Sequence, residues 1–137
     1  MATTRTGTVF GDNEAVVATI TGATTLGLGG SGKEYTLSAS AGAQITLPPV
    51  TQKGFKARFT VGSAFATTNW TIVSATNVIQ GSADVNSTLV PGANENTISF
   101  VATAETIGDY VEIYSDGTNF YAYGIGAGAG AITFTAV

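Results

Sequence analysis

The chain has 137 residues, of which only 10% are charged, where about a quarter is usual for a soluble domain. It contains no histidine and no cysteine. These two absences exclude Ser-His-Asp and Cys-His nucleophiles, disulfide bonds, and zinc sites built from Cys or His. The composition favours one domain that is not an enzyme, and we expect no catalytic residue, no cofactor and no metal ion.

The charges are divided unevenly along the sequence. The first 58 residues hold five bases and three acids, a net charge of +2, and the remainder holds six acids and no base, a net charge of −6. This division either orients the molecule on a charged surface or reflects solvated loops. The few basic residues do not form the array that nucleic acid requires, and no apolar run is long enough to cross a membrane. The N-terminus does not resemble a signal peptide, so we expect synthesis in the cytoplasm.

The predicted fold class is all-β, because Thr and Gly are abundant (23 and 18 residues) and unbranched helix formers are scarce. Short strand-like runs separated by turn residues favour a single jelly-roll-like antiparallel β-sandwich with extended termini. The predicted strands, in chain order, are 15–21, 35–39, 44–47, 55–61, 70–74, 78–80, 97–103, 109–115, 120–124 and 131–135.

Residues 1–34 are expected to form an N-terminal segment and a glycine-rich linker, ahead of a sandwich domain at 35–137. The stretch 27–34 (GLGGSGKE) formally matches phosphate-binding loops. Such loops need a helix directly after the glycines, whereas strand-like sequence and then Pro48-Pro49 follow here. Glu34 also stands where a phosphate loop has Ser or Thr. We therefore predict a linker and no nucleotide site.

Within the predicted domain, the strand 55–61 alternates apolar and polar residues, so Lys56 and Arg58 belong to one face and the core residues to the other. The segment 84–96 is the longest polar stretch, and we predict a loop there. Carboxylates and amides at 12–14 and 94–96 could hold calcium, but neither group has the spacing of a known calcium loop.

The strongest hairpin signal is Asp116-Gly117, which lies between two runs rich in aromatic residues. By parity, Tyr110 and Tyr114 share one face of the first strand, and Tyr121 and Tyr123 share one face of the second. These rings either form an exposed ladder for a sugar or protein partner, or pack inward with their hydroxyls at the rim. The acids Glu105, Asp109, Glu112 and Asp116 are the candidates for a glycosidase pair, but we expect them to be surface groups.

The small-residue stretch 124–131 (GIGAGAGA) and the final strand 131–135 suit a C-terminal arm that reaches over its own domain or a neighbour. The sequence also contains the runs YTL…ITLP, GFKARFTV, GDYVEI, SDGTNFY and ITFT between residues 35 and 135. In these runs the chain resembles the capsid cement (decoration) proteins of bacteriophages, with similarity to the β modules of phage tail fibres.

The resemblance implies a virion structural protein without catalysis that binds the outside of the assembled phage shell and stabilises it. Its implied partners are the major capsid protein and one or two further copies of itself, and its implied location is the virion. The alternative is a tail-fibre or spike module that binds a receptor or carbohydrate. We expect partner contacts through segments 2–10, 84–96 and 124–137, and through seven side chains: Lys53, Lys56, Arg58, Tyr110, Tyr114, Tyr121 and Tyr123.

Overall fold

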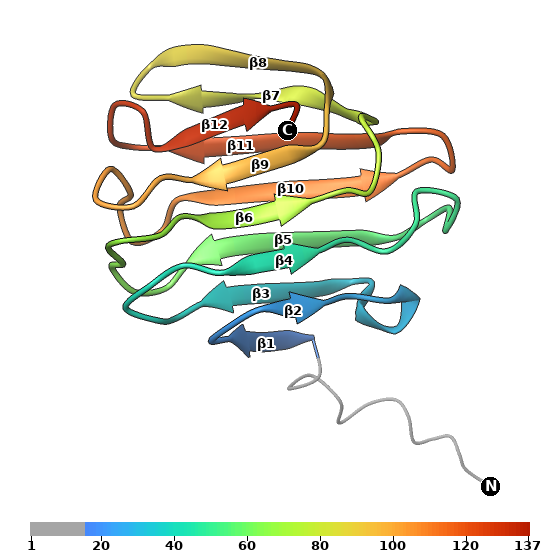
Figure 1. The fold of residues 1–137 in the computed structure, drawn as a ribbon, viewed down its shortest axis with the longest axis horizontal. Coiled ribbons are helices and arrows are strands. Elements are labelled where there is room, and N and C mark those ends of the chain that lie inside the picture. The colour runs from blue at the N-terminus through green and yellow to red at the C-terminus, as the bar shows by residue number, and fades with distance from the viewer. Residues whose placement is uncertain (1–15) are drawn as a thin grey trace, which may run out of the picture.

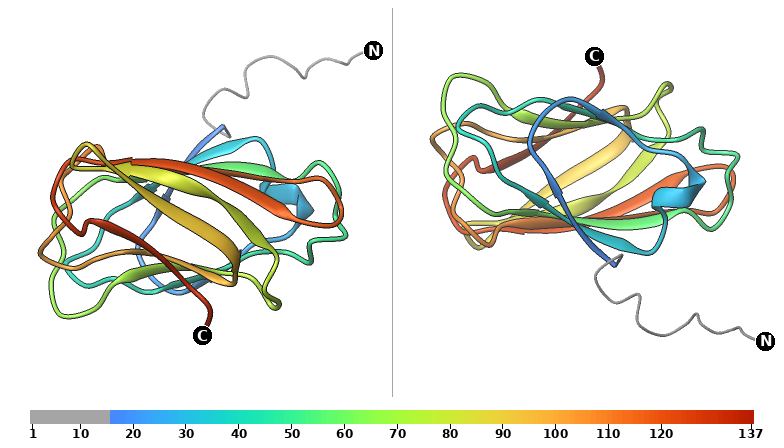
Figure 2. Two further views of the ribbon diagram at one scale, coloured as in Figure 1. Left: turned by 90° about the horizontal axis from the view of Figure 1, so that it is seen from above. Right: turned by 90° about the horizontal axis from the view of Figure 1, so that it is seen from below.

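The computed structural model describes residues 16–137 and shows two β-sheets packed face to face (Figures 1 and 2). The seven-stranded sheet has the order β1 (Val17–Ile20), β3 (Lys33–Leu37), β5 (Lys56–Val61), β10 (Tyr110–Ser115), β11 (Phe120–Gly126), β7 (Ile79–Val85) and β8 (Thr88–Glu95). The five-stranded sheet has the order β12 (Ile132–Thr135), β9 (Thr97–Phe100), β6 (Trp70–Val73), β4 (Gln44–Thr46) and β2 (Thr24–Thr25). The expected all-β sandwich is confirmed.

The first six strands wind between the two sheets, and each successive strand lies in the sheet opposite to the last. Because the chain returns to each sheet in the same direction, β1, β3 and β5 are parallel, as are β2, β4 and β6. The expectation of antiparallel pairing is therefore wrong for this half, and a jelly roll is not confirmed. Local alternation predicts a strand but carries no information about the direction of its neighbour.

The N-terminal segment belongs to the sandwich from Val17 onward, and the boundary expected at residue 34 falls inside β3. The predicted linker contains β2 and a single-turn 3₁₀ helix, η2 (Leu28–Gly30). The Tyr35 hydroxyl donates a 2.8 Å hydrogen bond to the Gly30 carbonyl, and burial raises the pKa of this phenol. Glycine content indicated flexibility, but backbone pairing and this hydrogen bond hold the segment in place.

The C-terminal half contains two hairpins. The hairpin at Asp116-Gly117 is confirmed: β10 and β11 pair antiparallel and lie between β5 and β7. The segment 84–96 is not a loop, because it contains the end of β7, a turn at Asn86 and Ser87, and all of β8. Both turn residues have positive φ (51° and 61°), the geometry that suits a two-residue hairpin.

The predicted C-terminal arm is also absent from residues 124–137, since β12 pairs antiparallel with β9 in the molecule's own five-stranded sheet. The Asn96 side chain holds the last residue, donating to the Val137 carbonyl at 3.0 Å and accepting from its N–H at 2.9 Å. Gly92 of β8 lies directly against the Phe134 ring, where a Cβ would come within 2.4 Å of the ring. The side of the sandwich at β8 and β12 is therefore closed.

Inward-facing side chains of both sheets form one core. The largest fully buried residues are Trp70, Phe55, Phe59, Phe100, Phe120, Leu37, Ile45, Ile72, Ile79, Ile98, Ile113 and Ile132. Tyr35 of β3 stacks on Phe59 of the neighbouring strand β5 at 5.4 Å, and Phe55, just before β5, meets Phe120 of β11 edge to face at 6.5 Å. No helix within residues 16–137 is long and apolar enough to span a bilayer.

Candidate functional site

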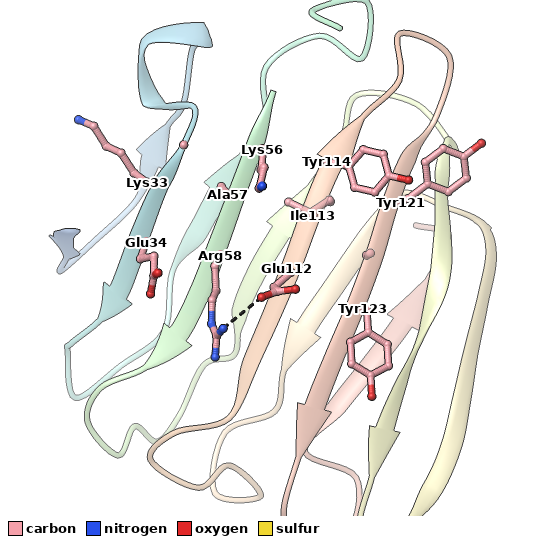
Figure 3. A pocket seen from close by; sticks show the side chains of 12 residues that line it. Lys33, Glu34, Lys56, Ala57, Arg58, Glu112, Ile113, Tyr114, Tyr121 and Tyr123 are labelled. Carbon is pink, nitrogen blue, oxygen red and sulfur yellow. Dashed lines mark hydrogen bonds and ion pairs between the residues drawn. The ribbon is translucent and has the colours of Figure 1, made fainter. Parts of the chain in front are cut away.

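The candidate site is the outer face of the seven-stranded sheet, where β5, β10 and β11 lie side by side (Figure 3). Alternation turns the even-numbered residues of β5 and β10 and the odd-numbered residues of β11 away from the core. We call the resulting surface the tyrosine face, and it consists of Lys56, Arg58, Tyr110, Glu112, Tyr114, Tyr121 and Tyr123. Six of the seven expected contact residues lie on it.

Strand register arranges these side chains in cross-strand rows. Lys56 lies opposite Tyr114, and Tyr114 lies opposite Tyr121. In the next row Glu112 lies between Arg58 and Tyr123. Of the two alternatives for the tyrosines, the structure shows the outward one: the rings of both strands lie on the outer face of the sheet, with Tyr114 and Tyr123 exposed and Tyr110 and Tyr121 half-buried.

An open groove of about 640 Å³ lies over this part of the sheet. Gly32, Ala57, Ile113 and Ala122 form part of its lining, and all three tyrosines of the two rows contribute to it. Lys33 and Glu34 line one end of the groove from β3, the strand next to β5, as Figure 3 shows. A groove of this size, with aromatic, cationic and anionic side chains together, fits either a protein segment or a saccharide.

Arg58 is the most constrained charged residue of the face. Its guanidinium donates to Glu112 Oε2 at 3.1 Å, and this is the only ion pair among residues 16–137. The guanidinium carbon lies 3.8 Å from the centre of the Tyr110 ring, a cation–π contact. The Arg58 and Glu112 side chains are 36% and 53% exposed, so the pair stays accessible to a partner and contributes little to folding stability.

The tyrosine rings supply the apolar part of the surface. Tyr114 and Tyr121 lie 5.4 Å apart with their planes tilted by 38°. Tyr114 is 51% exposed and Tyr123 is 46% exposed. Two rigid rings that already contact one another lose little conformational freedom on binding a partner.

The seventh expected contact residue, Lys53, precedes β5 and lies at one end of the same sheet. Its side chain is next to the Asp116–Gly117 turn, 3.4 Å from the position that a Cβ on Gly117 would take. In that turn the N–H groups of Asn119 and Thr118 donate to Asp116 Oδ1, each at 2.8 Å. These two hydrogen bonds hold the pKa of Asp116 below its ordinary value of 3.8.

Three exposed apolar residues extend this face: two lie in the expected contact segments 84–96 and 124–137 without being named individually, and Val17 lies in no expected contact segment. Val17 of β1, Leu89 of β8 and Ile125 of β11 are 56%, 66% and 40% exposed. Ile125 could have been found, because it continues the odd-numbered parity of Tyr121 and Tyr123. Leu89 was not named because segment 84–96 was predicted to be a loop. Val17 lies on the face only because β1 pairs with β3, which the sequence does not show.

Each of the four acids considered for a glycosidase pair has its own interaction elsewhere in the structure. Glu112 is paired with Arg58, and Asp116 caps the hairpin turn. Asp109 is 4% exposed and accepts the backbone N–H groups of Thr106 and Ala127 at 2.9 and 3.0 Å. Glu105 accepts the N–H of Phe65 at 2.9 Å.

Within residues 16–137, the calcium candidate at 94–96 does not have the geometry of a metal site. No cluster of three or more carboxylates gathers there. Asn94 bonds with Gln80 and Asn96 bonds with Val137, and the group at 12–14 lies outside the described residues. The expected contact segment 2–10 also lies outside them.

The chain matches no protein-family model, no curated protein and no solved structure.

Proposed function

We propose that this protein is a structural component of a phage virion that binds the outer surface of the assembled shell and stabilises it. The observation that carries the proposal is the tyrosine face, which exposes large aromatic side chains beside one solvent-accessible ion pair on a broad sheet surface. Clustered exposed aromatic residues with Arg beside them and further charges around them are typical of protein interfaces. The resemblance of residues 35–137 to phage cement proteins supplies the partner.

The arrangement of charge supports an oriented interaction. Among residues 16–137, every basic side chain lies on β3, on β5 or in the turn before β5. On the strands that follow β5 across the sheet (β10, β11, β7 and β8), every charged residue is an acid, including Glu112 of β10 and Asp84 of β7. The division seen along the sequence therefore becomes a division across one face, which favours one orientation on a charged partner.

Binding to an assembled shell stabilises it by mass action, because the protein adds free energy of binding to the assembled state alone. Such a role requires surface complementarity and no chemical step. It also agrees with a chain that has no histidine or cysteine. The proposal includes residence in the virion after synthesis in the host cytoplasm.

The decisive experiment compares shells that lack the protein with the same shells after purified protein is added. Decorated shells should rupture at a higher temperature in a light-scattering melt. The double variant Tyr114→Ala/Tyr123→Ala should bind shells about a thousandfold more weakly, since truncating aromatic anchors costs about 2 kcal/mol each. Thr135→Ala, an exposed change in the other sheet, is the matched control. Equal rupture temperatures with and without the protein would contradict the proposal.

A second candidate function is carbohydrate binding by a fibre or spike module. The groove beside the Tyr114–Tyr121 pair favours it, because aromatic rings stack on sugar rings while Arg58 and Glu112 can hydrogen-bond to hydroxyl groups. A glycan array of neutral and acidic saccharides, read with the wild type and with Tyr114→Ala, distinguishes the two functions. Binding to glycans that Tyr114→Ala abolishes, together with no binding to shells, would favour this candidate.

A further inference from the structure

The groove on the tyrosine face is basic, although the molecule as a whole is acidic. Residues 16–137 contain four bases and seven acids, a net charge of −3. Three of the four bases line the groove, together with only two of the seven acids, so the groove has a net charge of +1. The lining bases are Lys33, Lys56 and Arg58, and the lining acids are Glu34 and Glu112.

The charge of Arg58 is compensated within the face itself. Strand register places Glu34 opposite Arg58 on one side and Glu112 opposite it on the other. The contact with Glu112 is a closed ion pair at 3.1 Å. Neither Lys33 nor Lys56 makes an ion pair with any residue of the range 16–137. The charge that the groove can offer to a partner is therefore that of its two lysines.

These two lysines belong to the same end of the groove. Lys33 of β3 is in register with Ala57, the residue that follows Lys56 on β5. The N–H of Gly32 donates to the Lys56 carbonyl at 2.7 Å, which holds the two strands together at this point (Figure 3). Like charges on neighbouring strands repel one another, and an anionic group that binds beside them relieves this repulsion. This end of the groove therefore favours a carboxylate.

The two rings next to Lys56 provide an apolar surface at a fixed distance from this charge. Lys56, Tyr114 and Tyr121 form one cross-strand row. Neighbouring strands lie about 4.8 Å apart, so the middle of the ring pair lies about 7 Å across the sheet from Lys56. In an extended peptide, side chains two residues apart project to the same side with a separation of about 7 Å. The spacing of the row thus matches the side-chain repeat of a peptide that crosses the strands.

We propose that the groove binds an extended acidic protein segment in which a carboxylate side chain and an apolar side chain are two residues apart. The carboxylate contacts Lys56, with Lys33 beside it, and the apolar side chain lies on the rings of Tyr114 and Tyr121. The segment belongs to a subunit of the shell, an assignment that rests on the proposed function. Charge complementarity then fixes the direction in which the segment crosses the sheet.

Peptide binding tests the groove without the shell. The probe is a short dye-labelled peptide of Glu-Gly-Phe repeats, and its matched control has Gln in place of Glu. Fluorescence anisotropy should give a Kd at least about tenfold lower for the Glu peptide than for the Gln peptide, and added salt should reduce this difference. Equal Kd values for the two peptides would overturn the proposal. Tighter binding of an acidic oligosaccharide than of the Glu peptide would also overturn it.

A pair of charge reversals locates the binding site. Lys56→Glu should weaken binding of the Glu peptide about tenfold or more, and the exposure of Lys56 should let the fold persist by circular dichroism. Lys53→Glu changes the net charge equally but at a residue that does not line the groove, so its Kd should stay within about twofold of the wild type. Equal weakening by the two substitutions would show a general charge effect and overturn the proposal.

The same two variants, added to shells, separate this inference from the proposed function. We expect Lys53→Glu to raise the rupture temperature of the shell as the wild type does, and Lys56→Glu to raise it much less. Full stabilisation by Lys56→Glu would overturn the acidic segment and leave the shell function standing. A wild type that binds the Glu peptide through Lys56 but does not stabilise shells would contradict the proposed function and support the groove as a site for acidic segments.

Discussion

Gly81 has a backbone conformation that only glycine adopts easily. Its φ is 148°, it lies at an irregularity in the pairing of β7 with β8, and a Cβ built on it would come within 1.9 Å of the Ala122 carbonyl oxygen. Both the dihedral angle and the close approach of β11 therefore exclude a side chain.

We predict that Gly81→Ala lowers the free energy of unfolding by about 3 kcal/mol or more, because strain and a backbone clash act together. Urea denaturation would measure the loss. Gly27→Ala is the control, since no atom lies within 4 Å of its Cβ position, and it should change stability by less than about 1 kcal/mol. Equal effects of the two substitutions would show that β11 does not approach Gly81 as described.

Asp116 makes stability depend on pH in a defined direction. Its pKa in the folded state lies below the ordinary value of 3.8, because the N–H groups of Asn119 and Thr118 favour the carboxylate. A lowered folded pKa stabilises the fold above the unfolded pKa, and this contribution is lost as pH falls through the folded pKa.

We therefore expect Asp116→Ala to lower the free energy of unfolding, with the whole loss present above about pH 5. The loss should shrink progressively as the pH is lowered below 3.8. Urea denaturation of the wild type and of Asp116→Ala over a pH series would show whether their unfolding free energies converge at low pH. A stability difference that stays constant from pH 7 to pH 2 would contradict this account of the turn.

At the scale of elements, Asp109 joins two loops that are distant in the sequence. Its carboxylate is buried at the start of β10 and accepts from Thr106 in the preceding loop and from Ala127 in the loop between β11 and β12. The same loops meet where Val101 N–H donates to the Ala131 carbonyl at 2.9 Å.

Asp109→Ala should cost about 1–3 kcal/mol of unfolding free energy, because it leaves two part-buried backbone N–H groups without their acceptor. Hydrogen exchange should accelerate at the Thr106 and Ala127 amides and remain unchanged in β3. Asp84→Ala, on the exposed side of β7, provides the control. Normal protection of the Thr106 and Ala127 amides in Asp109→Ala would be the contrary result.

Local patterning predicted most strands but not all. The strand at 55–61 was evident because Phe55, Ala57, Phe59 and Val61 alternate with polar residues, and all four are at most 4% exposed. Strand β8 was missed because an edge strand with polar residues on both sides has the composition of a loop. The two-residue strand β2 gave no periodic signal, since it is too short to repeat.

At the scale of the whole molecule, the β10–β11 hairpin joins the two halves of the fold. It pairs with β5 of the wound N-terminal half on one side and with β7 of the C-terminal half on the other. Neither half can complete the seven-stranded sheet without it, so the two should unfold together.

We predict a single cooperative unfolding transition. Trp70 is the only tryptophan and is fully buried in the five-stranded sheet, so its fluorescence reports on that layer. Its denaturation curve should superimpose on the curve from far-ultraviolet circular dichroism, which reports on both sheets. Two separated midpoints would mean that the halves are independent units.

The sequence by itself determined the fold class, most strand positions and the parity of the tyrosines, because alternation and turn chemistry act between residues that are close in the chain. Tertiary structure alone decided that β3, β5, β10, β11, β7 and β8 are neighbours, and hence that Lys56, Glu112 and Tyr123 share one surface. Strand order and direction depend on packing between segments that are distant in the chain, and local periodicity contains no information about that packing. The tyrosine face is thus predictable strand by strand but exists as a surface only once the chain has wound between its two sheets.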